Sequence, residues 1–199
     1  MRGLTPLVLL LAAAATGAVR EPRSIRELVA AATVRLASGC SGAVAEAPQL
    51  IVTALHCVDG RATVGVRFGS GDERTARVAA TAAASDQAVL LLDAPASVAP
   101  LHIARRRQIP GTVLYYFGHP DRVAFQTARL DRIGQCPSLP ALPNALFTSI
   151  RGKPGDSGAP LVNAAGEIVG LVHGGAACQI ATPADTLVGL VERVLQRDA

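Results

Sequence analysis

A glycine-rich turn late in the chain decides the fold: residues 155–162 read GDSGAPLV, a serine with glycines close on both sides and an apolar run behind it. A serine hydroxyl is a weak nucleophile at neutral pH, so it needs a base within hydrogen-bond reach, and that base needs an orienting group. On its own the same stretch is often only a loop. It points to catalysis if the chain also supplies a histidine and a carboxylate.

Two earlier stretches supply these groups. Residues 53–58 read TALHCV and place His56 after an apolar run, and residues 85–91 read SDQAVLL and place Asp86 before another. Each group also has an ordinary interpretation, since a histidine beside a cysteine is usually structural and an aspartate before a strand is usually a turn residue. Together, His56, Asp86 and Ser157 would supply the base, the orienting group and the nucleophile that this chemistry needs.

Short runs rich in β-branched residues, separated by glycine, proline, aspartate and serine, surround these stretches. Runs at roughly 8–12-residue spacing predict an all-β barrel or sandwich. Six strands are expected on each side of a linker that carries prolines and the basic run Arg105–Arg107. The expected strands are residues 33–37, 42–45, 50–53, 62–68, 75–81 and 88–92, and then 112–117, 123–132, 145–150, 160–162, 167–172 and 179–181.

The chain closes on an expected helix. Thr182 is a suitable N-cap, Pro183 fits the first turn, and Asp185 provides a carboxylate near the positive end of the helix. Apolar residues then recur at helical spacing on one face. They are Leu187, Leu190, Val191, Val194 and Leu195.

Residues 1–18 have the pattern of an export signal, with a positively charged start, an apolar stretch and small residues at 15–18 for cleavage. An uncleaved anchor is the alternative, although a bilayer-spanning helix takes roughly 20 apolar residues. We expect the mature chain to be secreted, extracellular or periplasmic, and residues 19–28 to form an N-terminal arm or short pro-segment. In an oxidising compartment the four cysteines are expected to form two disulfides.

Together, residues 53–57 and 155–160 resemble the chymotrypsin-like (trypsin-like) serine protease family, most closely its small bacterial secreted members, and the resemblance spans residues 33–195. It implies an all-β fold of two six-stranded antiparallel β-barrels with a C-terminal α-helix and the site in the cleft between them. The expected division is a first barrel at 29–95, a linker at 96–110, and a second barrel with the helix at 111–199.

The resemblance also implies a role for each residue. Ser157 attacks the scissile carbonyl, His56 moves the proton, and Asp86 fixes the imidazole tautomer. The backbone N–H groups of Gly155 and Ser157 form the oxyanion hole. The implied function is that of a secreted serine endopeptidase that works through an acyl-enzyme intermediate.

Two other functions stay open. A catalytically silent binding protein on the same fold is one, because a fold does not by itself give a function. The complete set of triad residues argues against it. An esterase-like hydrolase with the same triad is the other, although the sequence lacks the Gly-x-Ser-x-Gly elbow typical of that class.

The resemblance implies a disulfide between Cys40 and Cys57, which staples the turn that carries His56. Cys136 and Cys178 are then left for a second bridge, which departs from the usual family pattern, because no cysteine precedes Ser157 closely. Metal binding by Cys40, Cys57 and His56 is the rival interpretation, but the sequence has none of the usual zinc-ligand spacings. We expect no metal and no cofactor.

The expected substrate pocket also departs from the family. Arg151 stands six residues before the serine, where it would form the pocket base and favour acidic over basic side chains, unless it points to solvent or pairs with Asp156. Gly174 and Gly175 would leave the pocket wall open. His173 replaces a usual serine, where it would line the cleft or support Asp86.

The start of the chain lacks the Ile-Val-Gly-Gly pattern of trypsin zymogens. The resemblance therefore implies that another cation, an arginine for example, pairs with Asp156.

The overall charge is mild, +4 with 19 basic residues and 15 acidic ones, and aromatic residues make up 3% of the chain with no tryptophan. Stacking platforms for single-stranded nucleic acid are therefore not expected. The basic run Arg105–Arg107 fits a solvated linker better than a polyanion site. We expect a polypeptide substrate, no nucleic-acid partner, no stable membrane anchor and a monomer.

Overall fold

The computed structural model describes residues 24–118, 125–142, 144–173 and 178–197. The predicted signal peptide at 1–18 lies outside these residues. Among the described helices, none is both long enough and apolar enough to cross a bilayer.

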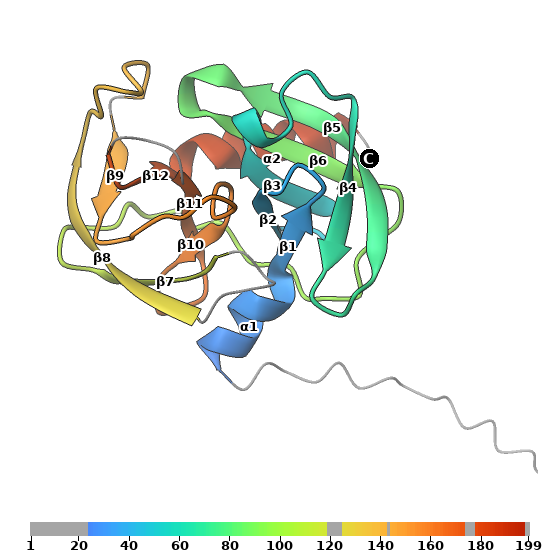
Figure 1. Ribbon diagram of the computed structural model, residues 1–199, viewed down its shortest axis with the longest axis horizontal. Coiled ribbons are helices and arrows are strands. Elements are labelled where there is room, and N and C mark those ends of the chain that lie inside the picture. The colour runs from blue at the N-terminus through green and yellow to red at the C-terminus, as the bar shows by residue number, and fades with distance from the viewer. Residues whose placement is uncertain (1–23, 119–124, 143, 174–177, 198–199) are drawn as a thin grey trace, which may run out of the picture.

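Two closed antiparallel barrels make up the fold and confirm the all-β prediction (Figure 1). In the first barrel the strands neighbour one another in the order β1-β2-β3-β6-β5-β4, and in the second in the order β10-β11-β12-β9-β8-β7. The first contains β1 (Thr33–Leu36), β2 (Ser41–Val44), β3 (Leu50–Ala54), β4 (Thr63–Phe68), β5 (Glu73–Ala82) and β6 (Gln87–Leu92). The second contains β7 (Val113–Phe117), β8 (Phe125–Gly134), β9 (Ala145–Thr148), β10 (Pro160–Val162), β11 (Ile168–His173) and β12 (Ile180–Pro183).

Strand burial follows from the two-residue period of β structure. In β4 the side chains of Val64, Val66 and Phe68 fill the first barrel, while the alternate residues face solvent. Every residue of β3 is buried, because its two faces meet two different cores. Ile51 points into the first barrel, and Val52 belongs to the core that the two barrels share.

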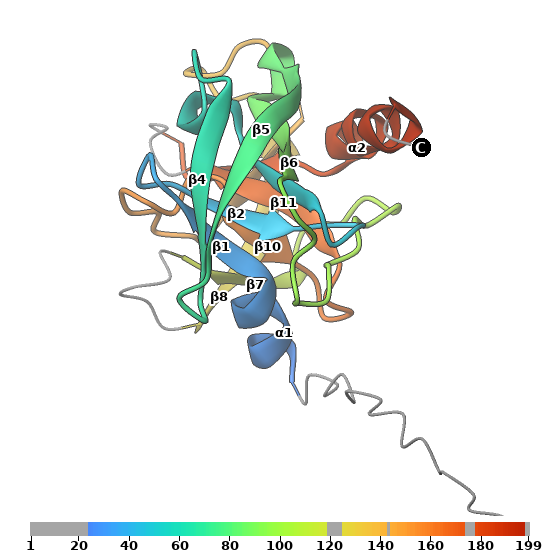
Figure 2. The same cartoon turned by 90° about the vertical axis from the view of Figure 1, so that its right-hand side faces the viewer.

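Two helices tie the barrels together. α1 (Ile25–Ala32) precedes the first barrel but contacts β7 of the second, and α2 (Asp185–Arg197) follows the second barrel but packs on β5 and β6 of the first (Figure 2). Their apolar faces enter the shared core, which also takes Leu101 of the linker and Leu171 of β11. The site region lies where the barrels meet, so it depends on this shared core.

The expected boundary at residue 28 falls inside α1, in which Val29 and Ala32 are fully buried and Leu28 packs against the shared core. One sequence expectation is corrected here. Thr182 and Pro183 do not begin the last helix, because they pair with β11 as part of β12, and the helix starts at Asp185.

Candidate active site

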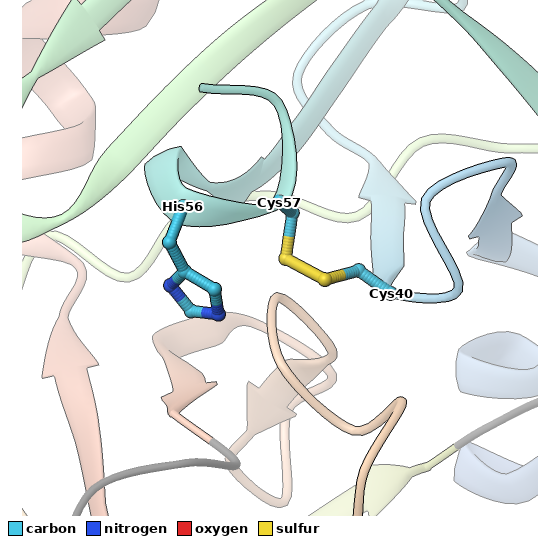
Figure 3. A group of neighbouring side chains, drawn as sticks. All are labelled: Cys40, His56 and Cys57. Atoms are coloured by element: carbon cyan, nitrogen blue, oxygen red, sulfur yellow. A yellow bond between two sulfur atoms is a disulfide. The ribbon is translucent and has the colours of Figure 1, made fainter. Parts of the chain in front are cut away.

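His56 sits in a short 3-10 turn, η1 (Leu55–Cys57), directly after β3. The Cys40–Cys57 disulfide ties this turn to the segment before β2, with the two Cα atoms 5.8 Å apart (Figure 3). The bridge lies one residue from His56, so it limits how far the histidine backbone can move. The imidazole itself is 41% exposed, which leaves it open to a ligand from solvent.

Asp86 is held in a left-handed backbone conformation, with φ 50° and ψ 50°, at the end of η2 (Ala83–Ser85). Aspartate is one of the few residues that visit this region readily. In this conformation Asp86 makes three hydrogen-bond contacts with residues of η1. Its carbonyl oxygen accepts from the Leu55 N–H at 3.0 Å, Oδ1 accepts from the His56 N–H at 3.0 Å, and Oδ2 lies 2.7 Å from Nδ1 of His56.

The contact changes the protonation of both partners. The hydrogen bond to Asp86 raises the pKa of His56 above its ordinary value, against an opposing effect of burial. Burial alone would raise the pKa of the Asp86 carboxyl, but the hydrogen bonds from His173 and His56 outweigh it and hold that pKa well below its usual range. Asp86 is therefore ionised at neutral pH, and its charge stabilises the protonated imidazole of His56.

Ser157 lies in a tight turn between Gly155 (φ 101°) and Gly158 (φ 81°). Both angles fall in the region that glycine adopts without steric cost. A Cβ at Gly158 would lie 2.3 Å from the Ser41 carbonyl oxygen, so only glycine allows the serine loop to approach the first barrel this closely. Ser157 is 7% exposed.

Asp156 anchors the serine turn inside the second barrel. Its Oδ2 accepts from the Lys153 N–H at 2.9 Å, and its own N–H donates to the Lys153 carbonyl at 3.0 Å. The side chain is fully buried. Burial raises the pKa of the nearby Tyr116 hydroxyl to about 12, and the negative charge of Asp156 adds to the effect.

Ser41 joins the serine turn to the first barrel. Its hydroxyl donates to the Gly155 carbonyl at 2.7 Å, and its N–H donates to the Ser157 carbonyl at 2.9 Å. Cys57 Sγ lies 3.8 Å from the same Ser157 carbonyl oxygen. These contacts place Ser157 beside the turn that carries His56, although the two residues come from different barrels.

His173 completes this group from the end of β11. Its Nε2 lies 3.2 Å from Oδ2 of Asp86, and its side chain is 13% exposed. Backbone hydrogen bonds of Val172 with Gly158 and Ala159 fix β11 beside the serine turn. Of the two sequence interpretations for His173, the geometry favours contact with Asp86 over lining the cleft.

The part of the chain that the structure describes does not bring the expected pocket residues Arg151, Gly174 and Gly175 together as it does His56, Asp86 and His173. Arg151 is exposed, as are Gly152 and Lys153 beside it. Gly174 and Gly175 lie outside the described residues. The acidic preference inferred from Arg151 therefore stays a prediction.

Gln87 is a site residue that the sequence analysis missed. It follows Asp86 directly, is fully buried, and its Nε2 donates to Thr182 Oγ1 at 3.1 Å and to the Pro183 carbonyl at 2.9 Å. It fastens the segment next to Asp86 to β12 of the other barrel. The sequence signal was a polar residue at the start of an apolar strand. Local sequence patterns do not distinguish such a buried residue from an ordinary turn residue.

The second disulfide, Cys136–Cys178, joins two segments of the second barrel, with Cα atoms 6.1 Å apart. Both sulfurs lie in a small apolar cluster with Leu142, Ala145 and Ile180. The bridge ties the segment after β8 to the segment before β12. Both cysteine pairs are the ones expected from the sequence.

Two groups in the described residues gather potential metal ligands within 4.8 Å. In the first, Cys40 and Cys57 are joined in a disulfide, so they offer no thiolate. In the second, both imidazoles of His56 and His173 are directed at Asp86 as hydrogen-bond partners. The geometry of the second group is that of a hydrogen-bonded cluster around one carboxylate.

Comparison with known proteins adds a family and several similar folds. A family model described as trypsin-like peptidase domain matches residues 40–171. Among solved structures, the chain is similar to Rv3671c from M. tuberculosis H37Rv in an inactive form, at 22% identity and a TM-score of 0.69, over 94% of this chain and 97% of that one. No curated protein sequence matches the chain.

Two further structures have the same fold. An HtrA-type protease, AlgW, crystallised with a tripeptide, is 19% identical with a TM-score of 0.73, over 86% of this chain and 62% of that one. The MamO protease domain from Magnetospirillum magneticum is 20% identical with a TM-score of 0.70, over 81% of this chain and 96% of that one. At these identities the structural likeness supports the fold alone.

Proposed function

Since the chain belongs to the trypsin-like peptidase domain family and is a serine-type peptidase, we propose that it is a secreted endopeptidase whose catalytic residues are His56, Asp86 and Ser157. The family acts on polypeptides, so the substrate is a peptide bond within a protein chain. The observation that carries the assignment is the 2.7 Å contact between His56 Nδ1 and Asp86 Oδ2 beside the Ser157 turn.

The first half of the proposed reaction forms an acyl-enzyme. Because Nδ1 of His56 is engaged with Asp86, Nε2 is the atom that takes the proton from the Ser157 hydroxyl. The serine oxygen bonds to the scissile carbonyl carbon, and the carbonyl electron pair moves onto its oxygen. When the intermediate collapses, the C–N bond breaks and His56 gives its proton to the leaving amine. The acyl group stays on Ser157 as an ester.

The second half releases the product acid. Water attacks the ester carbon while His56 takes its proton, the bond to the serine oxygen breaks, and the proton returns to Ser157. Gly155 and Ser157 are proposed to donate their N–H groups to the oxyanion in both halves. The N–H of Asp156, which lies between them in the chain, donates to the Lys153 carbonyl. Losing one such donor typically costs about 10²–10³ in rate.

A fluorophosphonate probe tests the proposal. The secreted protein is expected to be labelled covalently, and Ser157→Ala should abolish labelling and lower turnover by roughly 10⁴-fold or more. Ser138→Ala, which removes a hydroxyl outside the triad group, is the matched control and should keep both. A Ser157→Ala variant that cleaves peptides at the wild-type rate would contradict the assignment. Wild-type protein that is never labelled would favour a silent binding protein on this fold.

Secretion is supported by the signal-like pattern of residues 1–18 and by the two disulfides, which persist in oxidising compartments. N-terminal sequencing of the secreted protein should find a start at or after Ala18. An intact Met1 on most of that protein would contradict cleavage of the signal.

The specificity proposal rests on Arg151. An exposed guanidinium near the serine turn disfavours basic side chains before the scissile bond and favours carboxylates. A peptide-library profile should show poor cleavage after arginine or lysine, with glutamate or aspartate preferred over them. Strong cleavage after arginine would refute this preference and leave the peptidase assignment intact.

A further inference from the structure

A cavity separate from the proposed triad lies where the linker, the second barrel and the first turn of α2 meet. Its volume is about 250 Å³. It is lined by residues 104–108 of the linker, by side chains of β8, β9 and β11, and by residues around the start of α2. His56, Asp86 and Ser157 are not among the lining residues. The proposed peptidase reaction therefore gives this cavity no role.

The floor of the cavity is aliphatic. Val188 of α2 is half-buried there, and Ile133 of β8 is 37% exposed at one side. Such side chains offer neither a donor nor an acceptor, so a polar group placed against them loses its hydrogen bonds to water. The floor therefore fits the hydrocarbon part of a ligand. Its most buried residues, each at most 6% exposed, are Ala104, Leu146, Val169 and Ala184.

The mouth of the cavity carries three exposed arginines in a row. Arg105 is paired with Glu192 at 2.9 Å, and Arg107 is paired with Asp185 at 2.8 Å. All four of these side chains are exposed, and exposed ion pairs contribute little to stability. Arg106 has no ion-pair partner among the described residues. The mouth therefore holds a guanidinium group that can pair with an anion without first giving up a carboxylate.

We propose that this cavity binds a fatty acid of medium chain length, with the acyl chain on the aliphatic floor and the carboxylate on Arg106. The inference goes beyond the proposed peptidase function and does not depend on it. A guanidinium group binds a carboxylate through two parallel, charge-assisted hydrogen bonds. The basic run is too short for a polyanion, but one unpaired arginine beside an apolar cavity suits a ligand with a single negative charge and a hydrocarbon tail.

The volume of the cavity sets the length of the chain. It is roughly eight times the ~30 Å³ that one water molecule occupies in the liquid, and a methylene group takes up a similar space. An acyl chain of about eight carbons therefore fills it. The C-terminus of a peptide carries the same carboxylate, but its amide groups would lie against side chains that cannot hydrogen-bond to them. The cavity therefore favours the fatty acid over the peptide.

Isothermal titration calorimetry of the mature secreted protein tests the proposal with octanoate as the probe. Octanoate should bind saturably at one site per chain. It should bind roughly tenfold or more tightly than acetate, which lacks the chain, and than octanol, which lacks the charge. N-acetylated leucine keeps the carboxylate but adds an amide group, and it should also bind more weakly. The proposal is wrong if any of these three compounds binds as tightly as octanoate, or if millimolar octanoate shows no saturable binding.

An arginine substitution tests the charged half of the site. Arg106→Gln should weaken octanoate binding roughly tenfold, as expected for one hydrogen bond to a charged group, and should leave octanol binding unchanged. Arg61→Gln, at an exposed arginine that does not line the cavity, is the matched control and should bind octanoate as the wild type does. Unchanged octanoate affinity in Arg106→Gln, or an equal loss in both variants, would overturn the assignment of the carboxylate to Arg106.

A larger side chain tests the apolar half. Val188→Phe should fill the cavity and abolish octanoate binding, whereas Leu195→Phe, on the same helix but outside the cavity, should preserve it. Circular dichroism and thermal unfolding establish that each variant is folded. NMR of the wild-type protein gives a readout that needs no variant, because octanoate should shift the amide signals of residues 104–108 and 183–188. Shifts centred on other residues, or undiminished binding in a folded Val188→Phe, would place the ligand elsewhere and refute the proposal.

Discussion

At the scale of single residues, one carboxylate organises the site. Asp86 fits its place because it tolerates a left-handed backbone, accepts two hydrogen bonds from His56 and accepts a third from His173. These donors keep its pKa well below the usual range in spite of burial. Asparagine would tolerate the backbone but would present a neutral group that can donate as well as accept.

Asp86→Asn should therefore lower kcat by about 10⁴-fold, the effect known for this exchange in a serine triad, because the imidazole is held in the wrong tautomer. Asp131→Asn, which changes a carboxylate paired with Arg129 on the surface, is the control and should keep full activity. Steady-state kinetics on a fluorogenic peptide measure both. Wild-type kcat in Asp86→Asn would remove Asp86 from the mechanism.

The contact between His56 and Asp86 also predicts how activity and stability depend on pH. As pH rises, the activity should increase while the stabilisation from His56 decreases. His56 acts as a base only when neutral, so activity should fall as pH drops through its raised pKa, above the ordinary 6.5. Because the folded-state pKa is raised, the stabilisation from His56 is complete below 6.5 and is lost as pH rises through the folded value. For Asp86, whose pKa is lowered, the stabilisation is present above its ordinary 3.8 and is lost as pH falls below it.

A pH–rate profile and urea unfolding across the same pH range test this opposition. In wild type, activity should increase over the interval in which the contribution of His56 to the free energy of unfolding decreases. His56→Ala should lose the pH-dependent part of that contribution, while His102→Ala, at an exposed histidine on the linker, should keep it. Activity that stays constant as pH falls through the pKa of His56 would contradict a histidine base.

At the scale of elements, a buried side chain joins β6 to β12. Gln87 begins β6, and its amide satisfies a hydroxyl and a carbonyl at the end of β12. Thr186 of α2 donates to its Oε1 at 2.5 Å. The strand that follows Asp86 is thereby fastened to the opposite barrel.

Gln87→Leu should destabilise the protein by about 1–3 kcal/mol for each buried polar group left without its partner. Urea unfolding measures the change in the free energy of unfolding. The same exchange at Gln135, which is exposed and donates to the Pro140 carbonyl, should have little effect. Equal stability of the two leucine variants would show that the Gln87 contacts contribute nothing to folding.

At the scale of the whole molecule, residues of both barrels and both helices form one shared hydrophobic core. α1 reaches the second barrel and α2 reaches the first, so each end of the described chain is packed against the half to which it is not adjacent in sequence. The proposed triad takes His56 and Asp86 from the first half and Ser157 from the second. Stability of the shared core and assembly of the site are therefore coupled.

Leu190→Ala in α2 tests this coupling. Leu190 is 1% exposed within the shared core, and truncation there should cost roughly 2–5 kcal/mol. Leu195→Ala on the same helix, at a side chain that is 37% exposed, is the control and should cost much less. Hydrogen exchange should show lower protection in both barrels of Leu190→Ala. Loss confined to α2 would mean that the barrels are stabilised independently.

The sequence by itself determined the barrel strands and the identity of the triad candidates. The alternation of apolar and polar residues, as in β4, can be read from the strand itself and does not depend on which strand it pairs with. The glycines at 155 and 158 likewise mark a turn that few other residues could form. These features act over a few neighbouring residues, so they can be inferred without knowing the rest of the chain.

Only the tertiary structure decided which residues meet across the two barrels. Gln87 and Ser41 look ordinary in sequence, because their partners lie 95 and 114 residues away. The direction of His173 toward Asp86 depends on how β11 pairs beside the serine turn. The start of α1 inside the presumed arm depends on apolar partners from the second barrel. Such contacts carry no local signal, since the free energy that fixes them comes from packing between segments distant in the chain.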